Sequence, residues 1–227
     1  VRQAGKHGVK PLVGCEVYLA EERRRQVKGY AHLTLLAETN EGYANLIRLS
    51  SLGYLEGYYY KPRVDLELLQ QHSKGLIALS GCLASRVNQA LLGEDMDLAR
   101  REMDLLVQIF GKEDVYVEIQ DAGLEEHAKV NPGLLQLADE FGLTAVGTGD
   151  VHYLRAEDAD PHEVLLCIQT GDVLANEKRF QFPNKEFFLK TPEEMRRAFQ
   201  PYGRELLAPT RSEEHTAELQ SHHDLVC

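Results

Sequence analysis

Asp150 and His152 are a pair of residues whose types and spacing could support the binding of a metal ion. In an extended chain, side chains two residues apart leave the backbone on the same side, so a carboxylate and an imidazole could converge on one cation. Taken alone, the pair favours a structural alternative in which Asp150 caps a turn and His152 packs on Tyr153. The pattern therefore needs support from other residues.

Three further side chains suit a metal site by type. Cys82 follows a predicted strand, although free cysteine is often buried as a small hydrophobe, and for this residue alone packing is favoured. Glu16 lies inside an otherwise apolar strand, on the face shared with Gly14 and Tyr18, so its carboxylate must meet solvent, a partner or a metal. His32 begins a predicted strand, which is the wrong end for a site at the carboxyl edge of parallel strands.

Several other residues have functional interpretations that ordinary structural roles outweigh. Arg63 could reach a phosphate, but a salt bridge at the rim is the simpler role. Asp65 is predicted to cap a helix, and Glu118 and Asp121 are predicted to be surface charges. The tyrosines at 58–60 could stack on bases. Consecutive residues spread over different faces, so ordinary packing is favoured for them.

Composition restricts the class of protein. The chain has 227 residues, 43% of them hydrophobic, which is enough for a sizeable core. With 25 basic and 36 acidic residues the net charge is −11, so any contact with DNA must be local. The four cysteines lack paired spacing, which argues against a disulfide framework. No long apolar run or signal pattern is present, so we expect a cytoplasmic protein without a membrane partner.

The elements that would position these side chains alternate between strand and helix. Apolar runs predict strands at 11–19, 32–37, 76–80, 115–120 and 144–148. Helical periodicity precedes Gly111 and Gly142, and Asp160 and Thr191 are each followed by Pro and, at the third helical position, Glu, a pattern typical of helix starts. This alternation predicts an α/β fold with a parallel sheet, in which function gathers where the strands end.

The last seventeen residues, 211–227, break this pattern and resemble a translated sequencing-adapter artefact. We therefore predict two units, a domain at 1–207 and a non-native or disordered tail at 208–227. The tail contains His215, His222, His223 and Cys227, but a His/Cys-rich tract is only a compositional hint, and no metal site is predicted there.

Six blocks in order resemble one family. They are KPLVGCEVYLA, HLTLLAETNEGYANLIRLSSLGYLEGYYYKPRVD, HSKGLIALSGCLAS, VYVEIQDAG, TGDVHYLRAEDADPHEVLLCIQTG and FPNKEFFLKTPEEMRRAF. Together they resemble the PHP domain of bacterial DNA polymerase III alpha subunits, from Val1 to about Leu207. The resemblance implies an incomplete distorted (β/α)7 barrel. Two family motifs, His-x-His and Thr-Asp-His-Gly, would lie upstream of Val1.

The resemblance also implies a ligand set and a reaction. Five family positions that bind metal are retained, namely Glu16, His32, Cys82, Asp150 and His152. Two departures, Ala122 where the family often has His and Gly149 where it often has Asn, fall outside that set. Mixed ligands favour zinc, with manganese or iron as alternatives, while the parent polymerase would use magnesium.

The implied role is part of a DNA-directed DNA polymerase whose own active site lies outside this fragment. Its PHP domain would hydrolyse phosphodiesters as a 3′→5′ proofreading exonuclease. Two alternatives remain: a scaffold for a proofreading subunit and other replisome subunits, and a free-standing PHP phosphoesterase. DNA would be reached through the parent polymerase.

Overall fold

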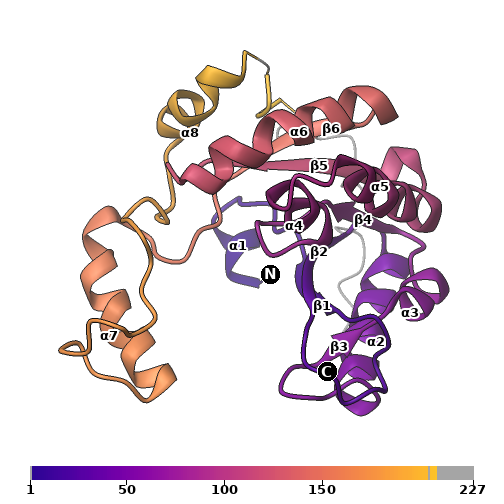
Figure 1. The fold of residues 1–227 in the computed structure, drawn as a ribbon, viewed down its shortest axis with the longest axis horizontal. Coiled ribbons are helices and arrows are strands. Elements are labelled where there is room, and N and C mark those ends of the chain that lie inside the picture. Colours follow the sequence, from indigo (N-terminus) through magenta and orange to yellow (C-terminus); the bar gives the residue numbers. More distant parts are fainter. Residues whose placement is uncertain (1, 204, 209–227) are drawn as a thin grey trace.

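The computed structural model describes residues 2–203 and 205–208. Its central feature is a single mixed sheet (Figure 1). The strand order is β3-β1-β2-β4-β5-β6. The strands are β1 (Gly14–Leu19), β2 (Ala31–Ala37), β3 (Arg63–Val64), β4 (Leu76–Leu79), β5 (Val115–Gln120) and β6 (Thr144–Thr148). The predicted α/β class is confirmed, and the arrangement is consistent with a distorted barrel of which six strands are present in the described chain.

Helices lie between most of the strands. They are α1 (Arg2–Lys6), α2 (Asn40–Leu55), α3 (Leu66–Gln71), α4 (Arg86–Leu92), α5 (Met96–Phe110), α6 (Glu125–Phe141), α7 (Ala159–Thr170) and α8 (Pro192–Phe199). Helix α2 packs against β2 and β3, α6 packs against β5, and α4 packs against both α5 and α6. This helical layer covers the apolar strands and leaves the strand ends for other contacts.

The direction of β2 corrects the expectation of a parallel sheet. Strand β2 is antiparallel to both of its neighbours, β1 and β4, whereas the pairs β1–β3, β4–β5 and β5–β6 are parallel. An antiparallel pair needs only a loop between its strands, and β1 is joined to β2 without a helix. The start of β2 therefore lies at the same edge of the sheet as the ends of β1 and β4.

Local chemistry accounts for most element boundaries. The predicted strands at 115–120 and 144–148 match β5 and β6, and Gly142 ends α6 in the left-handed conformation. Thr191 caps α8 reciprocally with Glu194, as predicted. The prediction for Asp160 was wrong, because α7 begins at Ala159 after a short 3-10 turn and Asp158 occupies the cap position.

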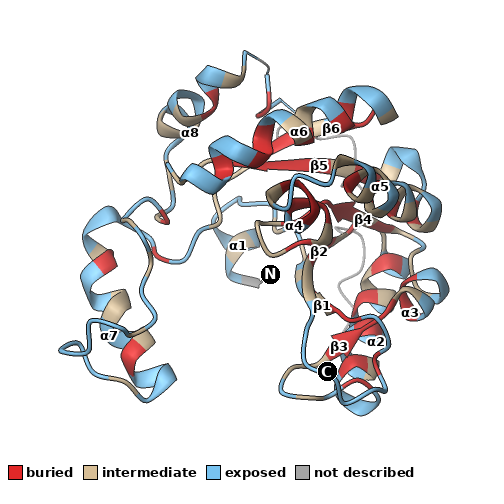
Figure 2. Cartoon of the chain, viewed as in Figure 1, coloured by how far each residue is buried: buried red, intermediate tan, exposed pale blue. Residues whose placement is uncertain are grey.

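The main core lies between the sheet and its helices (Figure 2), where β4 and β5 are largely buried. A second, smaller cluster of Ala122, Tyr153, Ala159 and Phe187 connects the segment after β6 to α7. Helix α7 itself projects from the sheet and is mostly exposed (Figures 1 and 2). Within the described residues, no helix combines the length and apolarity needed to cross a bilayer.

The predicted tail at 208–227 falls outside the described residues except for its first position. Leu206 and Leu207, at the end of the predicted domain, are buried in the main core. The division of the chain at 207/208 stays a prediction.

Candidate metal centre

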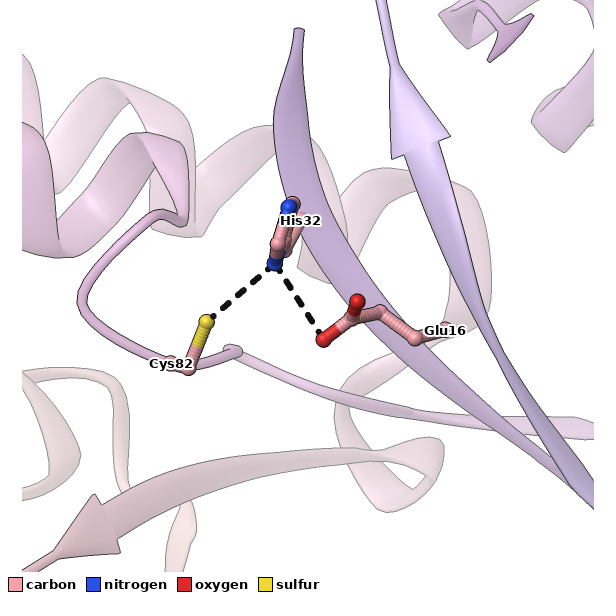
Figure 3. A group of neighbouring side chains, drawn as sticks. All are labelled: Glu16, His32 and Cys82. Atoms are coloured by element: carbon pink, nitrogen blue, oxygen red, sulfur yellow. Dashed lines mark hydrogen bonds and ion pairs between the residues drawn. The ribbon is translucent and has the colours of Figure 1, made fainter. Parts of the chain in front are cut away.

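Glu16, His32 and Cys82 converge at the edge of the sheet where β1 and β4 end and β2 begins (Figure 3). The Oε2 atom of Glu16 lies 3.2 Å from Nδ1 of His32. The Sγ atom of Cys82 lies 3.5 Å from the same nitrogen. Among the described residues, these three form the only group of His, Cys and acidic ligand atoms that all lie within 4.8 Å of one another.

Strand register brings Glu16 and His32 together. His32 is directly opposite Tyr18 in the antiparallel β1–β2 ladder, and Glu16 is opposite Thr34. Glu16 and His32 are therefore diagonal neighbours on one face, within reach of long side chains. The argument from strand direction that counted against His32 was wrong, because β2 runs opposite to β1 and β4 and presents its first residues at their carboxyl ends.

Cys82 is positioned by the turn between β4 and α4. Gly81 has a φ of +93°, a conformation that glycine adopts without strain. The side-chain amide of Asn88 donates to the carbonyl oxygens of both Gly81 and Cys82 at 2.9 Å. Ser85 then caps α4 by accepting from the Asn88 amide. Two consecutive carbonyls are thus tied to the buried Asn88 side chain, and the backbone N–H of the same residue ties the helix start to Ser85.

The three donor atoms fit a common divalent ion by chemistry and by spacing. Carboxylate, imidazole and thiolate are all zinc ligands, with bond lengths of about 2.0–2.2 Å to O or N and about 2.3 Å to S. In a tetrahedral site these lengths place O and N about 3.4 Å apart, and S and N about 3.5 Å apart. The measured separations, 3.2 and 3.5 Å, are close to both values.

The electrostatics of the cluster favour a charged imidazole in the metal-free protein. Hydrogen bonds to Cys82 and Glu16 raise the pKa of His32 to about 10, against the opposing effect of burial. The hydrogen bond from His32 lowers the pKa of Glu16, and His152 lowers it further. At neutral pH the His32 imidazole is therefore protonated in the metal-free protein, and its positive charge lies beside Glu16 and Cys82.

The structure keeps Asp150 and His152 near this cluster but outside the group of three. Asp150 has a φ of +45°, so the chain is not extended there and the alternation argument for the pair was wrong. Nδ1 of His152 instead lies 2.8 Å from the Asp150 carbonyl oxygen. If Nδ1 carries the proton of that contact, Nε2 remains available as a ligand atom. His152 contributes to lowering the pKa of Glu16, so it lies within electrostatic range of the cluster.

Aromatic rings surround the His152 imidazole. Its ring centroid lies 4.7 Å from that of Phe182, 5.8 Å from Phe187 and 6.1 Å from His162. The His152 amide also donates to the Phe187 carbonyl. The ring contacts of His152 therefore include two phenylalanines that are distant in the sequence.

Sequence reasoning missed a buried polar cluster behind the site. Glu118, expected to be a surface charge, is only 5% exposed. One carboxylate oxygen accepts from the Thr148 hydroxyl at 2.5 Å and from Gln120 at 3.2 Å. Burial raises the pKa of the Glu118 carboxyl, and Asp150 adds to that effect. Thr148 ends β6 two residues before Asp150. Its hydrogen bond to Glu118 therefore holds the backbone that leads into the Asp-x-His segment.

Three acceptor oxygens that line one small cavity of this cluster have no partner among the described residues. They belong to Glu118, Asn88 and Asn131. The orientation of each amide is set by its nitrogen, since that of Asn88 donates to two carbonyls and that of Asn131 donates to the Gln120 carbonyl and the Tyr202 hydroxyl. The only sequence signal was a Glu inside an apolar strand, the signal that identified Glu16.

The remaining candidates take structural roles or stay exposed. Arg63 is 2% exposed and donates to backbone carbonyls, so neither a phosphate contact nor a rim salt bridge is correct. Asp65 caps α3, as predicted. Asp121 accepts from the Tyr202 hydroxyl. Tyr58 and Tyr60 are 60% and 67% exposed, which contradicts ordinary packing for these two.

Comparisons with known proteins identify the family that the chain resembles. Residues 1–122 match the family described as PHP domain. The chain is 48% identical over 202 residues to a DNA polymerase III subunit alpha of Thermus aquaticus, covering 86% of this chain and 16% of that protein. It is 49% identical over 222 residues to the subunit of Deinococcus radiodurans, covering 93% and 16%. It is 41% identical over 210 residues to that of Treponema pallidum, covering 90% and 18%. The chain thus spans about one sixth of the curated relatives it matches.

Proposed function

Because the chain belongs to the PHP domain family, we propose that it is the metal-binding part of a replicative DNA polymerase and that its site hydrolyses phosphodiesters at 3′ ends. The observation that carries the proposal is the convergence of Glu16, His32 and Cys82 at spacings suited to one ion. Asp150 and His152 would complete the shell from the end of β6. Zinc fits this donor set best, with manganese or iron as alternatives.

The residues of the chain have separable roles in this proposal. Glu16, His32 and Cys82 would hold an ion, which when bound supplies an activated water and stabilises charge on a phosphoryl group. The Asp150 carbonyl orients the His152 ring. Asn88 and Glu118 hold the two segments that carry Cys82 and Asp150. Polymerisation, with its own magnesium, would be carried out by other parts of the parent protein.

A scaffold role is a second candidate, supported by the exposed apolar residues of α7. Leu165 and Ile168 are 62% and 72% exposed on a helix that projects from the sheet. A proofreading subunit or another replisome subunit could bind such a surface. The scaffold and the exonuclease make different predictions for a metal-site variant. The similarity to polymerase subunits argues against a free-standing phosphoesterase.

The test uses the full polypeptide that contains this chain. Metal content and the trimming of a 5′-labelled primer are measured for the wild type, for the double variant Asp150→Ala/His152→Ala, and for Cys82→Ala. A His72→Ala variant, altered at a partly exposed histidine that caps α3 outside the site, is the matched control. Primer extension by each protein reports whether the polymerase remains folded.

The proposal expects metal-dependent trimming that both site variants lose while primer extension and the His72 control are retained. Bound metal without trimming would refute the exonuclease and leave the scaffold. Absence of metal in the wild type, with growth media supplemented with zinc and manganese in turn, would refute the metal centre itself.

A further inference from the structure

Tyrosines and lysines lie next to the candidate metal centre, with Tyr30, Tyr60 and Lys28 exposed and Tyr18 and Lys61 half-buried. We call Tyr18, Tyr30, Tyr60, Lys28 and Lys61 the tyrosine–lysine surface. The ring centroids of Tyr18 and Tyr30 are 4.7 Å apart. The Lys61 ammonium lies 5.4 Å from the Tyr18 ring centroid, and the Lys28 ammonium lies 5.3 Å from that of Tyr60. Tyr60 and Lys61 are adjacent in sequence, which joins the two halves.

This surface reaches the metal centre through His32. The Tyr30 ring stacks on the His32 ring with an interplanar angle of 4° and a centroid distance of 6.0 Å. The Tyr18 ring meets the same imidazole edge-on at 5.4 Å. Glu16 and Tyr18 share one face of β1, and Tyr18 is opposite His32 in the ladder. The aromatic surface and the cluster are therefore parts of one continuous face.

The rings are presented to solvent by a constrained backbone. Tyr60 has a φ of +63°, which is uncommon for a residue with a Cβ, and it lies in a tight turn closed by pairing of Tyr59 with Lys61. Its side chain is nevertheless 67% exposed, so no buried packing compensates for this conformation. Tyr30 is 41% exposed. The Tyr60 ring meets the Tyr59 ring edge-on at 4.7 Å, and an uncommon backbone conformation that holds a mostly exposed ring suggests a role in binding.

The lysines give the surface a local positive charge on an acidic protein. The net charge of the chain is −11. Within the described chain, neither Lys28 nor Lys61 forms an ion pair, whereas Arg24 and Arg25 are paired with glutamates. Two ammonium groups beside tyrosine rings, of which those of Tyr30 and Tyr60 are exposed, are suited to a ligand that has both phosphates and flat bases.

We infer that the tyrosine–lysine surface binds the 3′-terminal nucleotides of a single-stranded nucleic acid and leads its end to the cluster of Glu16, His32 and Cys82. Bases stack on Tyr30 and Tyr60, and Lys28 and Lys61 contact the phosphates. Stacking tolerates every base, so the surface binds without sequence preference. This inference rests on the proposed hydrolysis of phosphodiester ends, for which it names the substrate surface.

Photocrosslinking tests the inference without requiring turnover. The probe is an oligothymidylate of about ten nucleotides with 5-iodo-2′-deoxyuridine at its 3′ end, a length within the usual span of single-strand sites. The full polypeptide is irradiated with the probe in EDTA, and crosslinked peptides are identified by mass spectrometry. We expect crosslinks to peptides that contain Tyr30 or Tyr60.

Substitutions then test the role of the rings. The double variant Tyr30→Ala/Tyr60→Ala is expected to require about tenfold more probe for half-maximal crosslinking to this chain. The variant Tyr30→Phe/Tyr60→Phe, which keeps both rings, should retain the wild-type value. Tyr54→Ala is the matched control, because Tyr54 is 60% exposed on α2 and its ring contact is with Tyr58.

The outcomes separate this inference from the proposed function. Crosslinks to Tyr30 or Tyr60 in a wild-type protein that binds metal but never trims DNA would support the surface and refute hydrolysis. Metal-dependent trimming with an unchanged KM in Tyr30→Ala/Tyr60→Ala would refute the surface and keep hydrolysis. Crosslinks confined to other regions of the polypeptide would also overturn the inference.

Discussion

Replacing Arg63 by methionine should release the loop that connects β1 to β2. The guanidinium is buried and, within the described structure, is neutralised by carbonyl dipoles rather than by a carboxylate. Nε donates to Gly57 at 3.0 Å, and the terminal nitrogens donate to Val27 at 2.7 Å, Arg23 at 3.0 Å and Arg25 at 2.7 Å. Three of these four acceptors lie in the connection that leads to Lys28, Tyr30 and His32.

The expected cost follows from the burial of those acceptors. A hydrogen bond to a charged group contributes about 1.5–3 kcal/mol, and a buried carbonyl left without a donor loses most of that amount. The bonds to Gly57 and Arg23 are buried, while those to Val27 and Arg25 are partly buried and can recover water. The Gly57 carbonyl keeps the Arg63 backbone N–H as a donor at 3.4 Å, so with a buried methionine offsetting part of the loss we expect about 3 kcal/mol of destabilisation, concentrated in the loop.

Hydrogen exchange followed by mass spectrometry is the direct assay, performed on the full polypeptide. Amides in residues 20–30 of Arg63→Met should exchange much faster than in the wild type, while those of β5 change little. Arg24→Met is the matched control, because Arg24 is 53% exposed and its ion pairs should contribute at most about 1 kcal/mol. Unchanged protection of the loop in Arg63→Met, together with weaker DNA binding, would refute this reasoning and restore the phosphate-binding interpretation of Arg63.

Three further predictions concern the site and its supports. Since the pKa of His32 is about 10, zinc must displace the proton of His32 when it binds at neutral pH. Calorimetry in buffers of different ionisation enthalpy should detect at least one proton released on zinc binding. Zero release would contradict the pairing of His32 with Glu16 and Cys82. The pKa of Glu118 is raised by burial, so its contribution to stability is full below its unfolded pKa and is lost as pH rises through its higher folded pKa. Urea denaturation should therefore show the wild type losing stability relative to Glu118→Gln with rising pH, and a pH-independent difference would argue for a charged Glu118. Asn88→Ala should weaken zinc binding about tenfold by freeing the Cys82 carbonyl, whereas unchanged affinity in a chelator competition would limit Asn88 to a packing role.

Local chemistry alone predicted much of the secondary structure. The runs at 115–120 and 144–148, the capping box at Thr191 and the C-terminal glycine of α6 depend on neighbours within a few residues, so the sequence contains the whole interaction. The α/β class follows from the same alternation. The resemblance to one family then named five ligand positions that composition and spacing left undecided.

What only the tertiary structure decided depends on residues distant in sequence. The direction of β2 is set by its pairing with β1 and β4, and that direction brings His32 to Glu16 and Cys82. Asp150 has a positive φ, so the chain is not extended there and its side chain need not leave on the same side as that of His152. The sequence by itself determined which donor groups the chain has and which local elements hold them. Their convergence required strand direction and register, because side chains separated by up to 66 residues meet only after the sheet has formed.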